Sequence, residues 1–296
     1  MGKSKSFVKK LFIDPCPLLE YFVNEDDDDI IKAIVGTDGI QEMLDVHTVF
    51  PEYAAHIAQR MKIPYTPHYP PISLEETMAF LSRPISERVT KFLTDRKFPL
   101  EVAPNYGISS WKWGEPHQYT SWKNYFPFNR DAMLISSAIL ANLGFVVDLT
   151  QEEFMTTVSY DRRGVMNCLV FRFVDEHISS LMCKWLFSHG RQATFGLEKV
   201  DPSKPVYVVE GLFDYIALDL MGEGQSVGLG SAFISDAHWK FLQGLDLIFL
   251  LDSDYTGRKY SQRLKAEGHK VMFLDNRYKD PWEYFSAKES LKMVDL

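Results

Sequence analysis

The chain has 296 residues, and its 46% hydrophobic and 24% charged content is that of an ordinary globular protein with one large or two modest domains. Its net charge of −8 excludes a basic field over the whole molecule that would draw it to nucleic acid, although a local basic stripe can suffice. No apolar segment is long enough for a signal peptide or a membrane-spanning helix, so we expect a cytoplasmic protein with no membrane partner.

The cysteines argue against a zinc site. Cys16, Cys168 and Cys183 lie far apart, no C-x-x-C pair occurs, and the eight histidines form no ligand-spaced pair with them. We therefore expect reduced thiols and no zinc.

The first 80 residues carry few signals, and we assign residues 1–80 as an N-terminal region of unknown role. The acidic run at 25–29 is more typical of the first turn of a helix than of a metal site. Five prolines between positions 64 and 84 indicate an extended connection. Ser73 and Glu76 form a capping box, which predicts the start of a helix.

Residues 81–203 mix helical and β-rich signals, and we expect them to form a basic subdomain of the α+β class. The spacing of apolar residues predicts helices over 85–93 and 131–144. A capping box at Thr150–Glu153 predicts a short helix in TQEEFMTTV. The runs CLVFRFV and SSLMCKWLF predict a hairpin that turns at residues 175–177.

Residues 204–296 change to an alternating pattern. Four short apolar runs, VYVVEG, QSVGLG, DLIFLLD and HKVMFLD, are separated by helical segments. Strands that alternate with single helices predict an α/β subdomain, a small parallel sheet flanked by helices.

Acidic residues follow these predicted strands. Glu210 ends the first strand, Asp252 and Asp254 follow the third, and Asp280 lies in the loop after the fourth. Because the carboxyl ends of parallel strands meet at one edge of the sheet, we expect these carboxylates to converge there. A site of carboxylates without histidine or cysteine favours Mg²⁺ or Mn²⁺, which act chiefly on phosphates.

Glycines and cations beside the acids fit the same chemistry. Gly211 and the Gly228/Gly230 pair are expected to let the backbone approach a phosphate closely. Arg258 and Lys259 are expected to contact nucleotide or template phosphates. The acids, the glycines and the cations are each weak signals alone, and only their occurrence together after successive strands is specific.

That conjunction resembles the Toprim domain of DNA primases, topoisomerases and some nucleases. VVEGLFDYIAL is similar to its first motif, with Glu210 at the invariant glutamate and Asp214 at the aspartate that follows in primases. LLDSDYTGRKY is similar to its second motif, D-x-D-x-A-G, with Thr256 in place of alanine. KDPWEYF resembles the primase K-D-P-x-D segment, in which Trp282 separates Asp280 from the next acid.

Upstream segments resemble primases in particular. VTKFLTDRKFPLEVAPNYGI has Arg96 at the position of the primase arginine and Lys97 where glycine is usual. The resemblance covers about residues 85–285 and identifies a DnaG-type primase catalytic core, of the kind that phages carry. From the cysteine count and the few residues after Asp280, we expect no counterpart of the family's zinc-binding module or helicase-binding domain in this sequence. We therefore expect a replicative helicase or a separate template-recognition subunit as a partner.

The resemblance implies a nucleotidyltransferase that uses Mg²⁺, a single-stranded DNA template and ribonucleoside triphosphates to make short RNA primers for DNA replication. It implies that Glu210, Asp252 and Asp254 hold the metal, with Asp280 in support. The expected nucleotide- or template-binding residues are Arg162, Arg163, Lys184, Lys199, Arg258 and Lys259. Two alternatives stay open: a Toprim nuclease that hydrolyses phosphodiester bonds, and a non-catalytic subunit that binds nucleic acid or a replication protein.

Overall fold

The computed structural model describes residues 74–112, 152–181, 184–187, 193–231, 233–275 and 277–292. The chain divides into two compact units, and the segments of the two units alternate along the sequence. One contains residues 1–89, 109–156 and 171–190, and the other contains residues 90–108, 157–170 and 191–296. The domain boundaries expected from the sequence, at 80/81 and 203/204, stay a prediction, and the helix expected over 131–144 lies outside the described residues.

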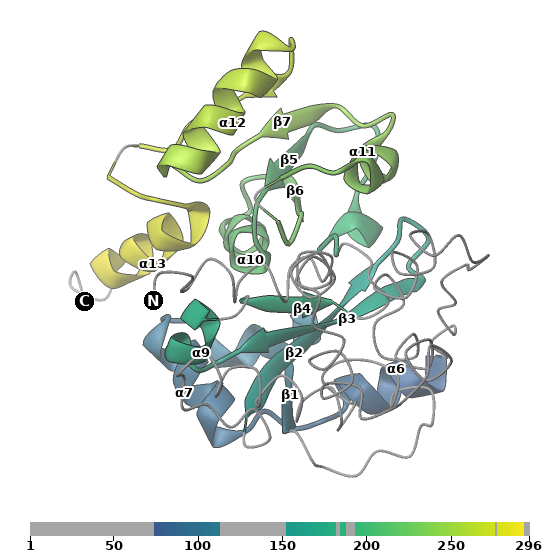
Figure 1. The fold of residues 1–296 in the computed structure, drawn as a ribbon, viewed down its shortest axis with the longest axis vertical. Helices are drawn as coiled ribbons and strands as arrows, with labels where there is room; N and C mark the ends of the chain where they lie inside the picture. Colours follow the sequence, from purple (N-terminus) through teal and green to yellow (C-terminus); the bar gives the residue numbers. More distant parts are fainter. Residues whose placement is uncertain are drawn as a thin grey trace, which may run out of the picture. The chain divides into compact units, whose positions relative to one another are not determined.

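A four-stranded sheet with the strand order β1-β2-β3-β4 is the main feature of the first part of the chain (Figure 1). The elements are α6 (Leu74–Leu81), β1 (Ser109–Lys112), β2 (Glu153–Tyr160), β3 (Met166–Phe173), α9 (Glu176–Leu181) and β4 (Trp185–Phe187). Helix α6 begins directly after Ser73, as the capping box predicts.

The short helix predicted in TQEEFMTTV is wrong, because this segment forms strand β2. Its residues from Phe154 to Ser159 are all buried, and β2 pairs antiparallel with β1, with Ser109 opposite Thr156. Branched and aromatic side chains favour a strand, and pairing with the neighbouring strands outweighs a local capping signal.

The simple hairpin between the next two runs is also wrong, because α9 separates β3 from β4. The Asp175 Oδ1 accepts a hydrogen bond from the Ile178 N–H at 3.0 Å, and Glu176 lies in the first turn of α9. The polar residues at 175–177 therefore start a helix and do not form a tight turn.

The predicted parallel sheet is confirmed. Its strand order is β6-β5-β7-β8, and every neighbouring pair is parallel. Figure 1 shows three of these strands, β5, β6 and β7. The strands are β5 (Val206–Val209), β6 (Gln225–Gly228), β7 (Leu247–Phe249) and β8 (Lys270–Val271). The helices are α10 (Leu212–Met221), α11 (Asp236–Leu242), α12 (Tyr255–Ala266) and α13 (Pro281–Lys292), the last of which the sequence analysis did not predict.

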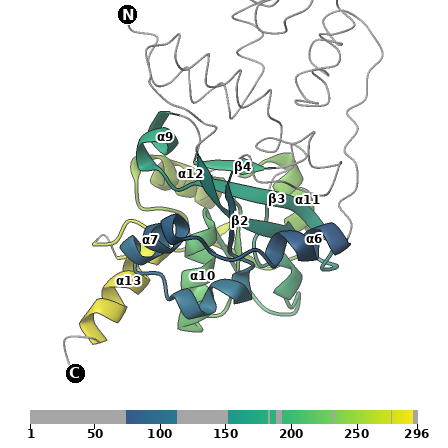
Figure 2. The same cartoon turned by 90° about the horizontal axis from the view of Figure 1, so that it is seen from below.

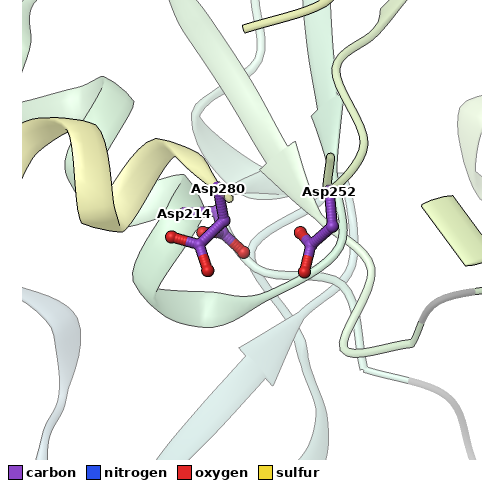
Figure 3. Close-up of side chains that lie close together, drawn as sticks. All are labelled: Asp214, Asp252 and Asp280. Carbon is purple, nitrogen blue, oxygen red and sulfur yellow. The ribbon is translucent and has the colours of Figure 1, made fainter. Parts of the chain in front are cut away.

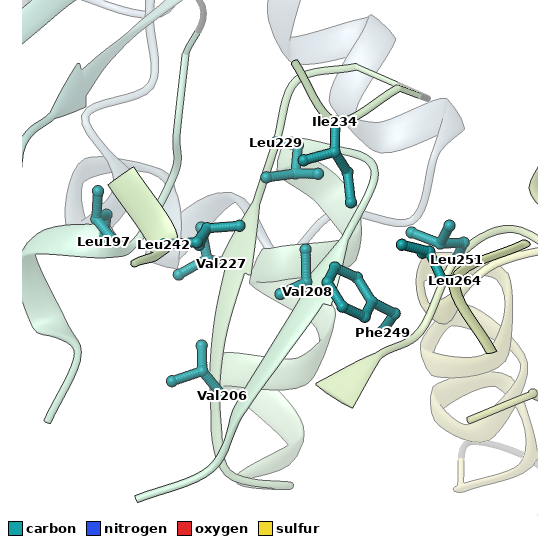
Figure 4. Close-up of a cluster of buried hydrophobic side chains, with 10 residues drawn as sticks. All are labelled: Leu197, Val206, Val208, Val227, Leu229, Ile234, Leu242, Phe249, Leu251 and Leu264. Carbon is teal, nitrogen blue, oxygen red and sulfur yellow. The ribbon is translucent and has the colours of Figure 1, made fainter. Parts of the chain in front are cut away.

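The two faces of this sheet differ. Ten buried apolar residues form the core on the face covered by α11 and α12 (Figure 4): Leu197, Val206, Val208, Val227, Leu229, Ile234, Leu242, Phe249, Leu251 and Leu264. Full burial of one such side chain stabilises the fold by about 1.5–3 kcal/mol. On the other face Ser226 and Gly228 contact α10, where the Ser226 hydroxyl donates to the Tyr215 carbonyl at 3.4 Å.

Helix α7 (Glu87–Asp95) ends in a Schellman motif, in which the Phe98 N–H donates to the Leu93 carbonyl at 2.9 Å. The Lys97 N–H donates to the Thr94 carbonyl at 2.8 Å. Lys97 takes the left-handed conformation that this motif requires, with φ 58°. Glycine, which the resemblance to primases leads us to expect at this position, adopts the left-handed conformation without the steric cost of a side chain.

Helix α13 lies beside α10 (Figure 2), and an aromatic cluster fixes its start. The Trp282 ring stacks on Phe98 at a centroid distance of 5.6 Å and lies 5.3 Å from Phe213 and 5.4 Å from Phe285. The Trp282 indole N–H donates to the Arg96 carbonyl at 3.1 Å. Through Arg96 and Phe98, the residues of the Schellman motif thus hold in place the loop that carries Asp280. Among the described residues, no helix combines the length and the apolar character needed to span a membrane.

Candidate metal centre

Three carboxylates from distant segments meet at the carboxyl-terminal edge of the parallel sheet (Figure 3). Asp214, Asp252 and Asp280 each offer an oxygen within 4.8 Å of the others. Asp214 lies in the first turn of α10, Asp252 follows β7, and Asp280 precedes α13. The convergence expected from parallel strands is therefore present for Asp252 and Asp280.

Asp214 is the most buried member, with 8% of its surface exposed. Its Oδ2 accepts from the Gly211 N–H at 3.0 Å, and its Oδ1 accepts from the Trp282 N–H at 3.4 Å. Burial, followed by the charges of Asp280 and Asp252, raises the pKa of its carboxyl well above the usual value. The residue set predicted from the sequence did not include Asp214, although VVEGLFD contains it at the third position of the helix.

Glu210 supports Asp252 through the backbone. Its Oε1 accepts from the Asp252 N–H at 3.1 Å. Burial raises the pKa of Glu210 to about 8, and the negative charge of Asp252 contributes to this shift. Glu210 therefore contacts the three-carboxylate cluster through a hydrogen bond to the backbone of Asp252. Its role as a direct metal ligand stays a prediction.

Gly257 makes this close packing possible. A Cβ at this position would lie 2.2 Å from the Asp252 carbonyl oxygen and 3.0 Å from the Glu210 Oε1. Only glycine lets the start of α12 approach the segment after β7 so closely. Gly228 has a similar packing role, because its Cβ would lie 2.6 Å from the Gly211 carbonyl oxygen.

Asp254 caps α12. It is exposed, and its Oδ1 accepts from the Gly257 N–H at 3.0 Å. A carboxylate at a helix N-terminus is stabilised by the helix dipole as well as by this bond. Asp254 lies outside the three-carboxylate cluster, and its predicted role as a metal ligand is untested.

A cation already lies among the acids. The Lys279 Nζ is 3.1 Å from the Asp252 Oδ2 and 3.9 Å from the Asp280 Oδ2. Burial alone would lower the pKa of Lys279, but its hydrogen bond with Asp252 and that group's charge outweigh burial, so the pKa lies above the usual value. Burial raises the pKa of Asp252 despite this partner.

Backbone hydrogen bonds hold the loop of Lys279 and Asp280 in place. The Ser253 N–H donates to the Lys279 carbonyl at 2.6 Å, and the Glu283 N–H donates to the Asp280 Oδ1 at 2.8 Å. The Glu283 carboxylate accepts from the Lys279 N–H. Glu283 thus acts at the start of α13, and it is not one of the three clustered carboxylates.

Three of the predicted cations contact other groups of the chain. The Arg162 guanidinium donates to the Gln243 carbonyl at 2.7 Å, after the end of α11. Arg163 forms two hydrogen bonds with Asp161, at 2.7 and 3.0 Å. Lys199 lies 3.7 Å from Asp219, five residues beyond Asp214 on α10 and therefore about 7.5 Å further along the helix axis.

The structure therefore brings neither Arg162 nor Lys199 to the carboxylates, and their binding to phosphate stays a prediction. Lys184 is exposed beside β4. Arg258 and Lys259 are exposed on the first turns of α12, where the Arg258 Nε donates to the Ser253 carbonyl at 2.6 Å. These two are the predicted cations nearest in sequence to the carboxylates.

The donor set fits a hard divalent cation. It consists of carboxylate oxygens from several segments, and the ammonium of Lys279 among them shows that the site accommodates positive charge. Mg²⁺ and Mn²⁺ prefer such oxygen ligands.

The segment that carries the carboxylates is similar to a known family: residues 207–285 match the family described as Toprim-like. Comparison with curated proteins gives no match.

Among solved structures, the RNA polymerase domain of Mycobacterium tuberculosis primase DnaG matches with a TM-score of 0.51 and 16% identity, over 75% of this chain and 80% of that one. The same domain in complex with double-stranded DNA gives a TM-score of 0.50 and 15% identity, over 73% and 77% of the two chains. A DNA primase domain from Pseudomonas aeruginosa gives a TM-score of 0.47 and 23% identity, over 73% of each chain.

Proposed function

The chain has the fold of the DnaG primase catalytic core, with a Toprim-like segment at residues 207–285, and we propose that it is a DNA primase. It synthesises short RNA primers on a single-stranded DNA template from ribonucleoside triphosphates. The observation that carries this proposal is the meeting of Asp214, Asp252 and Asp280 at the sheet edge within that fold.

The reaction is a nucleotidyl transfer. The 3′-hydroxyl oxygen of the growing primer forms a bond to the α-phosphorus of the incoming nucleotide, and the bond from that phosphorus to the bridging oxygen breaks to release pyrophosphate. Asp214, Asp252 and Asp280 would hold a Mg²⁺ ion, with Asp254 as a further candidate ligand. When bound, the ion would supply positive charge that offsets the charge of the triphosphate.

Other residues of the chain position these ligands. Glu210 fixes the backbone of Asp252 through its N–H, and the Gly211 and Trp282 N–H groups orient Asp214. Arg258 and Lys259 face solvent on the first turns of α12 and bind nucleotide or template phosphates. A replicative helicase or a separate template-recognition subunit completes the system.

A primer-synthesis assay with labelled ribonucleotides, Mg²⁺ and a single-stranded template tests the proposal. The wild-type chain is expected to make labelled oligoribonucleotides while the template stays intact. Asp252→Asn is expected to lower synthesis at least about 100-fold, because one ligand charge is lost where phosphate charge must be neutralised. Circular dichroism checks that the fold is retained.

Asp246→Asn is the matched control, since Asp246 pairs with Lys270 before β7, at the opposite end of that strand. It is expected to leave synthesis within about twofold, because surface ion pairs contribute little. Template degradation without oligoribonucleotides would overturn the proposal in favour of a nuclease. Undiminished function of Asp252→Asn would favour the non-catalytic subunit.

A further inference from the structure

Exposed apolar side chains are concentrated at the edge of the parallel sheet that carries the carboxylates. Seven large hydrophobic residues are exposed in the part of the chain that the structure describes, and four of them lie here. We call these four the apolar rim: Phe233, Tyr255, Met272 and Phe273, with exposed fractions of 60, 82, 47 and 52%. They follow β6, β7 and β8, so each leaves a strand at its carboxyl end.

Tyr255 is the most exposed member of the rim and the closest in sequence to the metal centre. It is the first residue of α12, three residues after Asp252. The backbone around it is fixed, because Asp254 caps the helix and the Arg258 N–H donates to the Asp254 carbonyl at 3.0 Å. A ring with 82% of its surface exposed contributes little to the core.

Two cations share the helix face of Tyr255. Arg258 and Lys259 lie three and four residues further along α12, which is the spacing of neighbours on one face, and both are exposed. An aromatic ring beside cations matches the alternation of base and phosphate in a single strand. The core of a protein–protein interface is instead depleted in lysine, so a protein partner fits this face less well.

We propose that Tyr255 stacks on a base of the single-stranded nucleic acid at the carboxylate edge, while Arg258 and Lys259 contact its phosphates. Phe233 extends the platform from the neighbouring segment; its ring packs on Tyr260 of α12 at a centroid distance of 5.9 Å. This inference rests on the proposed function and adds a base-binding surface to it, independent of base identity because every base has a face on which a ring can stack.

Binding of a fluorescently labelled single-stranded oligonucleotide, followed by anisotropy in the presence of EDTA, tests the inference without any catalytic step. Tyr255→Leu keeps an apolar side chain but removes the ring, and it is expected to weaken binding about tenfold, the effect of about 1.4 kcal/mol. Tyr255→Phe keeps the ring and is expected to bind within about twofold of wild type.

The matched control is Met78→Ala, which removes a large side chain with 57% exposure from helix α6 and is expected to leave binding unchanged. Salt dependence separates the two kinds of contact. Lys259→Met is expected to reduce the slope of log K against log salt by about 0.7, the value for one phosphate of a single strand, whereas Tyr255→Leu leaves the slope unchanged.

Equal binding by wild type and Tyr255→Leu would overturn the inference and leave the rim as a surface for a protein partner. The same loss in Tyr255→Leu and Tyr255→Phe would also overturn it, because stacking does not need the hydroxyl. Primer synthesis by the wild type is measured separately. If the wild type makes primers but Tyr255→Leu binds the oligonucleotide as well as wild type does, only this inference is refuted. If the wild type makes no primers, the proposed function is refuted.

Discussion

Lys279 places a positive charge among the carboxylates before any metal arrives. Its ammonium lies 3.1 Å from Asp252, one of the three clustered acids, so a divalent cation at this cluster competes with it. The ion pair compensates carboxylates that would otherwise repel one another. Lys279 therefore stabilises the metal-free centre and opposes metal binding.

We expect Lys279→Met to bind Mg²⁺ or Mn²⁺ about five- to tenfold more tightly than wild type, the size of a partly exposed ion pair. Isothermal titration calorimetry measures the affinity. Lys270→Met is the matched control, because it removes the same charge from an aspartate ion pair, with Asp246, away from the cluster. An equal gain in both variants would show that net charge, and not direct competition, sets the affinity.

At the scale of elements, the end of α7 carries strain that glycine would relieve. Lys97 has a φ of 58°, and a side chain in this left-handed region costs about 1 kcal/mol. The contacts that Arg96 and Phe98 make with Trp282 offset this strain.

Lys97→Gly is accordingly expected to raise the free energy of unfolding by about 0.5–1 kcal/mol, measured by chemical denaturation. Gly222→Ala is the converse control: Gly222 follows α10 with a φ of 68°, and an added Cβ would meet no atom within 4 Å. Backbone strain alone should therefore destabilise Gly222→Ala by about 1 kcal/mol. A loss of stability in Lys97→Gly would contradict the strain argument.

At the scale of the whole molecule, the raised pKa of Glu210 links folding to pH. Its folded pKa of about 8 lies above the ordinary value of 4.5, so the folded state binds this proton more tightly than the unfolded state does. The contribution of Glu210 to stability is therefore complete below about pH 4.5 and is lost as the pH rises through 8.

In EDTA, the difference in unfolding free energy between wild type and Glu210→Gln is expected to change with pH, at up to about 1.4 kcal/mol per pH unit between pH 5 and 8. Wild type loses stability relative to the variant as the pH rises. Denaturant titrations at several pH values measure this difference, and Glu223→Gln, an exposed substitution after α10, is the control. A difference that does not change with pH would contradict the shifted pKa of Glu210.

The parallel sheet could be predicted from the sequence, because it repeats a local pattern of short apolar runs and helices. The positions of Asp252 and Asp280 followed from the rule for strand ends. Asp214 was missed as a cluster member because its place depends on Trp282, 68 residues away. Strand β2 was missed because its pairing with β1 is also non-local, and α13 because its packing uses aromatic residues from α10 and from the segment that follows α7.

The hydrogen bond between Asp214 and Trp282 also bears on the order in which the site is made. A ribosome adds about 5–20 residues per second, so Asp214 leaves it several seconds before its partner, which lies 68 residues later in the sequence. During that interval the nascent chain contains the sequence of β5 and α10 but neither Asp280 nor the Trp282 N–H group. The three-carboxylate cluster can therefore be complete only after the residues up to Trp282 have been synthesised.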